Sequence, residues 1–352
     1  MQLADFDYHL PEERIAQEAL ADRAGSRMLV VHREEGCWED RVFGDLPEYL
    51  RPGDCLVVND SRVFPARLFG HRGGIHALPI GRNNPRRREH LSGAVEVLLL
   101  RSVSPDGRDW QALVRPGRKL PVGERITFAE GLEGEIVGRG EFGERTVRFH
   151  GSEDLYATFE RIGHVPLPPY IKRTDSPADR DRYQTVFARE RGSVAAPTAG
   201  LHFTDEVLAR CRRAGAGQAF VTLHVGLGTF QPLHEETVEQ VRLHTEHYRI
   251  TPANAAAMDA ARRVVAVGTT SVRTLETVAR TGQLEGETAI VLYPGVPFLK
   301  TGAMLTNFHL PRTSLLLLVC AFGGKDLVMA AYRHAVESEY RFYSYGDCML
   351  IL

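Results

Sequence analysis

Short apolar runs alternate with helical segments over the last 200 or so residues, and this alternation limits the possible folds more than any other feature. Residues 219–225 and 264–268 are apolar at nearly every position, as expected for parallel strands buried on both faces. Helices are predicted at 204–214, 254–263 and 269–281, the last capped by Thr269 or Thr270. Strands and helices in this order form a layered α/β domain.

The remaining predicted elements continue the α/β pattern at both ends of the chain. They are strands at 28–31, 55–58, 290–293 and 349–352, and helices at 11–16, 313–322 and 326–339. Between about residues 62 and 150 the pattern changes, because short β-rich runs alternate with Gly, Pro and Asp turns. Such runs lie at 94–100, 110–114, 125–128 and 146–149. We therefore expect an α/β domain over 1–61 and 151–352, interrupted by an all-β barrel or sandwich at 62–150.

Charge is unevenly distributed along the chain. Residues 62–150 hold 16 Lys and Arg against 10 Asp and Glu, whereas the remainder holds 27 against 35. This asymmetry favours a polyanionic partner such as nucleic acid for the basic part. The alternative is an Arg-rich surface loop at 81–93 without a binding role.

Five scattered cysteines without a Cys-x-x-Cys motif argue against a disulfide framework and against a thiolate zinc site. The acidic N-terminus is unlike a signal peptide, and no apolar window approaches the ~20 residues that span a bilayer. We expect a cytoplasmic protein without membrane contact.

Three segments of low bulk stand out as candidates for a single composite pocket. Residues 192–204 combine small residues with His202, Phe203 and the start of a helix. Residues 223–230 carry His224 in a Gly-rich turn. Residues 267–273 place hydroxyl groups and a guanidinium at the start of another helix. Small residues let the backbone approach a ligand, and helix N-termini hold anions. For each histidine the alternative is a core imidazole bonded to a carbonyl group, and for the hydroxyls it is helix capping.

Three further polar segments are candidate sites. Residues 307–314 precede the most apolar helix, and His309 and Arg312 exceed what capping of that helix needs. His244 and His247 could bind a metal ion, but no third ligand has a recognisable spacing. A role of Glu246 as a general base is therefore preferred over a metal site. Residues 340–347 hold three tyrosines, which fit either a buried helix end or an aromatic face for an RNA base.

Eight motifs, in order and nearly from end to end, resemble the S-adenosylmethionine:tRNA ribosyltransferase-isomerase family of queuosine biosynthesis. They lie at 5–12, 58–68, 181–188, 192–204, 224–230, 268–276, 305–311 and 340–350. The resemblance implies an α/β domain interrupted by a small β-barrel. It also implies an enzyme that transfers the ribosyl part of S-adenosylmethionine to a 7-aminomethyl-7-deazaguanine at the tRNA wobble position and isomerises it, giving epoxyqueuosine-tRNA, adenine and methionine.

This chemistry needs proton carriers and groups that hold the donor, but no metal and no cofactor, since S-adenosylmethionine is consumed as a substrate. The expected catalytic residues are His202, His224, Glu246 and His309. The expected substrate-binding residues are Thr198, Phe203, Gly226, Gly228, Thr229, Thr269, Thr270, Ser271, Arg273, Asn307, Arg312 and Tyr343. The partners are the precursor tRNA and the sulfonium donor, and the enzyme is expected to be a monomer.

Two departures from the family pattern affect single positions. His247 stands where the family has an aromatic ring, and Arg312-Thr313-Ser314 replaces Lys-Ser-Thr, which keeps the charge and both hydroxyls. Two other functions stay open from the residues: a binding protein without catalysis, and a metal-dependent hydrolase using His244 and His247.

Overall fold

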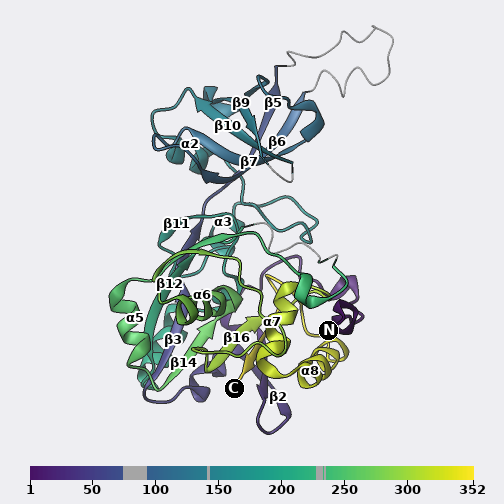
Figure 1. Cartoon of the computed structure of the whole chain (residues 1–352), viewed down its shortest axis with the longest axis vertical. Helices are drawn as coiled ribbons and strands as arrows, with labels where there is room; N and C mark the ends of the chain where they lie inside the picture. The colour runs from purple at the N-terminus through teal and green to yellow at the C-terminus, as the bar shows by residue number, and fades with distance from the viewer. Residues whose placement is uncertain (74–92, 141–142, 227–232, 234) are drawn as a thin grey trace. The chain divides into compact units, whose positions relative to one another are not determined.

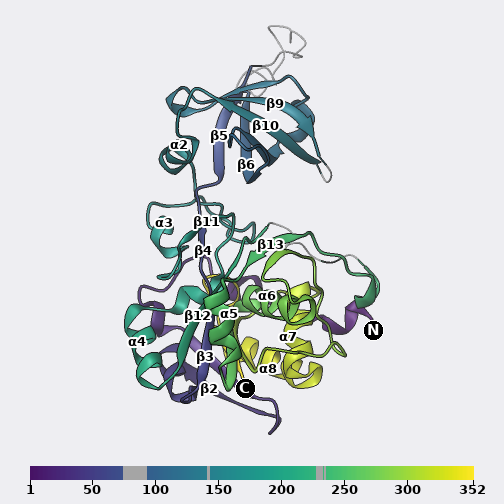
Figure 2. The same cartoon turned by 60° about the vertical axis from the view of Figure 1, so that its left-hand side comes forward.

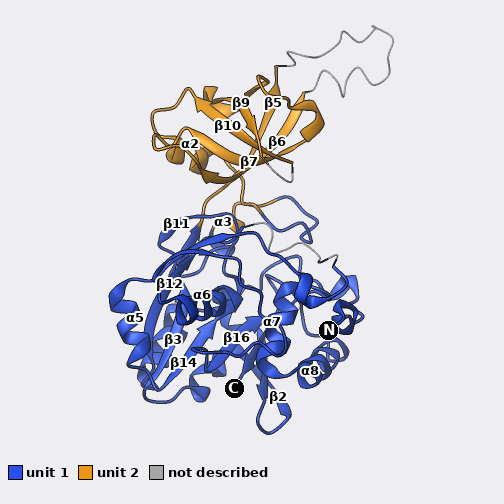
Figure 3. Ribbon diagram, viewed as in Figure 1, with its two compact units in different colours: residues 1–62, 167–174, 181–352 blue, residues 63–166, 175–180 orange. Residues whose placement is uncertain are grey.

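The computed structural model describes residues 1–73, 93–140, 143–226, 233 and 235–352, and these form two compact units (Figure 3). Unit 1 comprises Met1–Arg62, Leu167–Thr174 and Asp181–Leu352, and unit 2 comprises Val63–Pro166 and Asp175–Arg180. The sequence placed the insertion at 62–150, whereas residues 151–166 and 175–180 group with unit 2.

Unit 1 is built on a nine-stranded sheet, counted over the described residues, with the order β15-β13-β12-β3-β14-β16-β17-β1-β2. Its strands are β1 (Arg27–His32), β2 (Cys37–Val42), β3 (Asp54–Asn59), β12 (Gly217–Leu223), β13 (Glu246–Arg249), β14 (Arg263–Val267), β15 (Glu285–Thr288), β16 (Ala303–Asn307) and β17 (Cys348–Ile351). β12, β3, β14 and β16 run parallel to one another, so their carboxyl ends meet at one edge of the sheet.

Helices cover both faces of this sheet (Figures 1 and 2). α5 (Pro252–Asp259), α6 (Gly268–Thr281), α7 (Ser314–Gly323) and α8 (Lys325–Glu337) contribute to the core on one face, and α4 (Asp205–Arg213) with the 3-10 helix η4 (Phe43–Tyr49) contributes to the core on the other. The middle of strand β3, residues 55–58, is apolar because it is buried on both faces: Cys55 and Val57 belong to the first core, and Leu56 and Val58 to the second.

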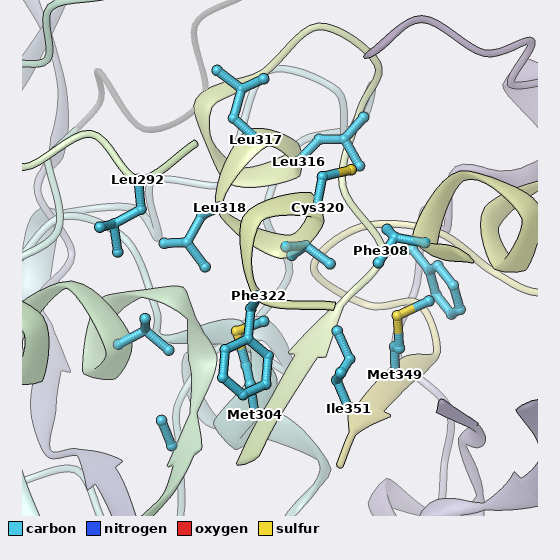
Figure 4. Close-up of a cluster of buried hydrophobic side chains, with 14 of the residues drawn as sticks. Leu292, Met304, Phe308, Leu316, Leu317, Leu318, Cys320, Phe322, Met349 and Ile351 are labelled. Atoms are coloured by element: carbon cyan, nitrogen blue, oxygen red, sulfur yellow. The ribbon is translucent and has the colours of Figure 1, made fainter. Parts of the chain in front are cut away.

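The largest cluster of buried side chains surrounds α7 (Figure 4). Thr313 caps the helix, because its hydroxyl accepts a hydrogen bond from the Leu316 amide. Gly323 ends α7 where a Cβ atom would lie 2.7 Å from Val328 of α8, so the close approach of the two helices requires glycine. Among the described residues no single helix can span a bilayer by length and composition; only α7 and α8 together pass that test, across a bend of 115°.

Unit 2 contains a closed barrel with the strand order β10-β7-β6-β5-β8-β9. Its strands are β5 (Arg67–Arg72), β6 (Ala94–Ser102), β7 (Asp109–Arg115), β8 (Arg125–Thr127), β9 (Glu133–Arg139) and β10 (Glu144–His150). The helix α2 (Leu155–Ile162) joins this unit because Phe159 packs its ring 5.4 Å from Trp110 and 5.1 Å from Phe149. The predicted fold, an α/β unit with a small all-β barrel, is confirmed.

Shorter elements complete the chain. They are the strands β4 (Ser61–Val63) and β11 (Glu190–Ser193), which pair with each other, the helix α3 (Asp179–Arg182) and several 3-10 turns. One of these turns, Glu12–Arg14, stands where the sequence predicted a helix at 11–16.

Two predictions of strands need correction. Residues 290–293 form no strand; β15 lies just before them, and Leu292 is buried in the core without ladder pairing. Conversely, β16 was not predicted, although all five of its residues are buried. An apolar run indicates burial, and burial alone does not distinguish a strand from an irregular segment.

The α7 core generates a stability prediction. Leu316→Ala removes a fully buried side chain and leaves a cavity, so we expect a loss of about 2–5 kcal/mol in the free energy of unfolding, measured by urea denaturation. Leu299, which is 55% exposed, is the matched control, and Leu299→Ala should change stability by less than about 0.5 kcal/mol. Equal losses for the two variants would contradict this view of the core.

Candidate active site

A pocket lies at the edge where the parallel strands end. Val225 follows β12, residues 268–270 follow β14, and residues 306–310 surround the end of β16. Residues 196–199 form a further wall, so all three low-bulk segments predicted from the sequence contribute to it. The pocket has a cavity volume of about 50 Å³ and opens to solvent. The other lining residues are Tyr170, Thr313, Leu315, Tyr343 and Ser344.

The helix α6 presents its N-terminus to this pocket without a side-chain cap. Gly268 turns the chain from β14 into the helix with a φ of 83°, a left-handed conformation that favours glycine. The N-cap position is Val267, so the predicted capping by Thr269 or Thr270 is wrong. The hydroxyl of Thr270 is shielded from solvent and has no partner among the described residues. A helix N-terminus with free donors is suited to an anionic group.

Asn307, the last residue of β16, is held by His202. The Asn307 amide nitrogen lies 3.2 Å from Nε2 of His202, and 3.0 Å and 3.4 Å from the carbonyl oxygens of Tyr343 and Asp347. On its other side, His202 Nδ1 lies 2.9 Å from the hydroxyl of Ser26. Burial, and secondarily the charges of nearby arginines, lower the pKa of His202 to about 4. His202 is therefore a neutral imidazole that supports the pocket wall from behind.

His309 lines the pocket itself. Its Nε2 lies 2.8 Å from the hydroxyl of Thr306, and the hydroxyl of Tyr332 accepts a hydrogen bond from its backbone amide. The hydroxyl of Tyr8 donates to its carbonyl oxygen, so the peptide of His309 is held at both ends. Its Nδ1 has no partner within the described part of the chain and is the ring atom left for a ligand. Burial lowers the pKa of His309 to about 3.

Glu246 and Arg273 form a buried ion pair next to the segment that carries Val225 of the pocket lining. Glu246 of β13 binds Arg273 of α6 through one carboxylate oxygen and accepts a hydrogen bond from the Gly226 amide, at 2.9 Å, through the other. Both charged side chains are only 5% exposed. Nε and Nη2 of Arg273 have no partner among the described residues. The pair thus connects α6 to the segment after β12 that forms part of the pocket.

Several predicted site residues lie outside the pocket lining. The hydroxyl of Ser271 donates to the Val267 carbonyl inside α6, and Phe203 is fully buried in the core beneath α4. Arg312 is exposed, with a φ of 57°. The structure therefore brings together Thr198, Thr269, Thr270, Asn307, His309 and Tyr343 in the lining, with His202 directly behind it.

His224 lies in different surroundings. Its ring is stacked on that of His247, at 6.3 Å, and packs against Gly192. Burial, followed by the nearby His247, lowers the pKa of His224. The metal alternative has no support in the described part of the chain, where no group of three or more His, Cys, Asp or Glu could hold an ion.

Two predicted residues, Gly228 and Thr229, lie outside the described residues, as does most of the Arg-rich segment 81–93. Among residues 340–347, Tyr340 is fully buried and its hydroxyl donates to Asp40, so this part forms no open aromatic face. Only Tyr343 and Ser344 of that segment reach the pocket.

Sequence reasoning missed some of the lining. Thr306 and Ser344 adjoin predicted residues, and the hydroxyl next to Asn307 was an available signal. Tyr170 had no such signal, because its hydroxyl meets Ser344 across 174 positions of the chain, and only the folded structure brings the two together.

The chain is similar to known proteins over its full length. The family model for queuosine biosynthesis proteins matches residues 3–351. An S-adenosylmethionine:tRNA ribosyltransferase-isomerase from Solibacter usitatus is 79% identical over all of both chains, and one from Symbiobacterium thermophilum is 50% identical over all of both. The crystal structure of S-adenosylmethionine tRNA ribosyltransferase from Thermotoga maritima is similar with a TM-score of 0.54 and 37% identity, covering 99% of this chain and 100% of that one.

The buried imidazoles predict how stability depends on pH. Both pKa values are lowered in the folded state, to about 4 for His202 and about 3 for His309, from an ordinary 6.5. Between pH 6.5 and about 4 the unfolded chain binds protons that the folded chain does not, so stability falls as pH falls. Each group contributes a slope of about 1.4 kcal/mol per pH unit.

Urea denaturation at several pH values above 5 tests this. In the double variant His202→Gln/His309→Gln, the free energy of unfolding should depend less steeply on pH than in the wild type. The difference should correspond to up to two fewer protons bound on unfolding. An unchanged slope would mean that these imidazoles protonate freely in the folded protein.

The ion pair generates a further stability prediction. Arg273→Met leaves the Glu246 carboxylate buried without its cation, and we expect a loss of about 3–5 kcal/mol in urea denaturation. Replacing both partners, in Arg273→Met/Glu246→Leu, should recover most of that loss because no uncompensated charge remains. A double variant as unstable as the single one would show that packing, and not charge, accounts for the effect.

Proposed function

The chain belongs to the queuosine biosynthesis protein family, and from this premise we propose that it is an S-adenosylmethionine:tRNA ribosyltransferase-isomerase. The single observation that carries the proposal is 79% identity over the full length of a relative with that name. The substrates are S-adenosylmethionine and a tRNA with 7-aminomethyl-7-deazaguanine at the wobble position. The products are epoxyqueuosine-tRNA, adenine and methionine.

The reaction makes three demands on the protein. A base must take a proton from the 5′-methylene group, which the adjacent sulfonium acidifies. An acid must assist the departure of adenine as the ribose opens. The donor must be held while the aminomethyl group attacks and methionine leaves as the epoxide closes. The residues that meet these demands are proposed below.

We assign the proton transfers to His309. Its Nε2 bonds Thr306, whose hydroxyl donates to the Asn307 carbonyl, so the ring proton sits on Nε2 and Nδ1 has a free lone pair. With a pKa of about 3 the ring is neutral across the physiological range. A proton accepted from the 5′-carbon is then readily passed to the departing adenine, because the imidazolium is a strong acid in this environment.

Donor binding is assigned to the lining residues Thr198, Thr269, Thr270, Asn307 and Tyr343, which present hydroxyl, amide and helix N-terminal groups. Glu246 and Arg273 receive a positioning role, because the carboxylate is bonded both to the guanidinium and to the Gly226 amide. His202 likewise acts through Asn307.

Finer expectations accompany this function. The reaction as written balances without a redox group or a metal, so we propose that the enzyme uses no cofactor. We propose further that it acts as a monomer and, since its substrate is tRNA, that it works in the cytoplasm.

Incubation of the protein with S-adenosylmethionine and a precursor-containing tRNA tests the function directly. We expect release of adenine and methionine in step with conversion of the tRNA base, followed by mass spectrometry of the digested tRNA. A protein that binds both substrates but releases no adenine would overturn the proposal in favour of a binding protein.

His309→Gln tests the assignment of the proton transfers. Loss of the imidazole should lower kcat by about 10²–10⁴-fold and leave the KM for S-adenosylmethionine within a few-fold. The exposed His247 provides the matched control, and His247→Gln should retain the wild-type kcat. A kcat near the wild-type value for His309→Gln would assign the proton transfers elsewhere.

A further inference from the structure

We infer that the amino-acid end of the sulfonium donor, with its α-carboxylate and α-ammonium groups, binds between the N-terminus of α6 and the side-chain oxygen of Asn307. The inference rests on the proposed function and names which end of the substrate this part of the pocket holds. It also gives His202 a defined task, which is to orient Asn307.

Two buried polar atoms in the pocket lining have no partner among the described residues: Oγ1 of Thr270 and Oδ1 of Asn307. Thr270 is 7% exposed and Asn307 is 2% exposed, so both atoms are shielded from bulk solvent. A buried polar atom without a hydrogen bond destabilises the protein, and a ligand that bonds to it recovers that free energy. The two atoms therefore indicate where a polar ligand makes contact.

The orientation of the Asn307 amide is determined by its neighbours. Three acceptors surround one end of it: Nε2 of His202 and the carbonyl oxygens of Tyr343 and Asp347. Only the NH₂ group can donate to them, so Oδ1 must be the end without a partner. Asn307 thus offers the ligand an acceptor, which bonds N–H or O–H groups.

His202 must be neutral for this arrangement. It accepts the Asn307 hydrogen bond at Nε2, so its own proton is on Nδ1 and is donated to Ser26, whose hydroxyl lies 3.4 Å from the Arg23 carbonyl oxygen. An imidazolium could not accept from Asn307 and would repel a cationic ligand. His202 is therefore a positioning residue that acts through Asn307.

The anion site is directly beside this acceptor. β14 and β16 are parallel neighbours in which Val267 pairs with Leu305, so α6 begins at Gly268 beside the last residues of β16, Thr306 and Asn307. The free N–H groups of α6 and the Thr270 hydroxyl therefore face an anion next to the oxygen that faces a donor. The site therefore suits a ligand that carries a negative group and a positive hydrogen-bond donor close together.

Among the parts of the two substrates, only the amino-acid end of the donor has this character. Adenine and ribose present N–H or O–H donors but no anion, and in RNA the donor nearest to a phosphate, the ribose 2′-hydroxyl, is uncharged and lies on a different carbon atom. An α-carboxylate and an α-ammonium share one carbon atom, and a helix N-terminus with an amide oxygen complements both.

Equilibrium binding of two probes isolates this end of the donor. S-Adenosylhomocysteine and 5′-methylthioadenosine share the adenosine and the thioether, but only the first carries the amino-acid end. By calorimetry we expect wild-type protein to bind S-adenosylhomocysteine at least tenfold more tightly. Asn307→Leu should weaken S-adenosylhomocysteine about tenfold to a hundredfold and leave 5′-methylthioadenosine within twofold.

Asn254→Leu is the matched control, because the oxygen of Asn254 bonds the Phe220 amide outside the pocket; both affinities should be unchanged. Thr270→Val provides a second variant that breaks no hydrogen bond of its own hydroxyl, and it should weaken only S-adenosylhomocysteine. Equal affinity of the two probes for the wild type, or equal weakening of both by Asn307→Leu and Thr270→Val, would overturn the inference. Binding is measured without turnover, so a failure here is distinct from an absence of the proposed reaction.

His202 variants test the positioning role. His202→Leu removes the acceptor for Asn307 and should weaken S-adenosylhomocysteine selectively, whereas His202→Gln offers an amide oxygen in its place and should restore part of the affinity. A merely structural role would lower the affinity for both probes alike, and that result would contradict the assignment.

Discussion

The parallel pairing of β14 with β16 is the interaction on which the site depends. The pairs Val265–Ala303, Ala266–Met304 and Val267–Leu305 bring two segments, far apart in the sequence, to the same edge of the sheet. One segment continues into α6 through Gly268, and the other ends in Asn307. A shift of this register by one residue would exchange the faces of β16 and turn Asn307 away from its position beside the helix N-terminus.

Burial determines the chemical character of the pocket. His202 and His309 are both neutral because desolvation lowers their pKa values, and the buried charges of Glu246 and Arg273 neutralise each other next to the pocket. A sulfonium donor is a cation, so a site with uncompensated arginines at the reacting centre would repel it. A neutral acceptor and helix N–H groups can hold the α-ammonium and α-carboxylate groups of such a donor.

Much of the fold and part of the site could be predicted from the sequence. Apolar strands and low-bulk segments are local properties, and they identified β3, β12 and β14 as well as the three segments that reach the pocket. The role of each residue within the site depends on its neighbours in the folded chain, which the local sequence does not reveal. His224 and His309 have similar local surroundings in the sequence, but only the neighbours of the folded chain place one beside His247 and the other in the pocket. The sequence predicts Glu246 as a base, and only the folded chain shows its partner Arg273, 27 residues away on α6.

A crystal structure of the protein with S-adenosylhomocysteine bound is the most direct test of where the donor lies. We expect the ligand carboxylate at the N-terminus of α6 and its amino group on the oxygen of Asn307, with the thioether toward His309. Electron density for the ligand at another surface, with this pocket empty, would contradict it.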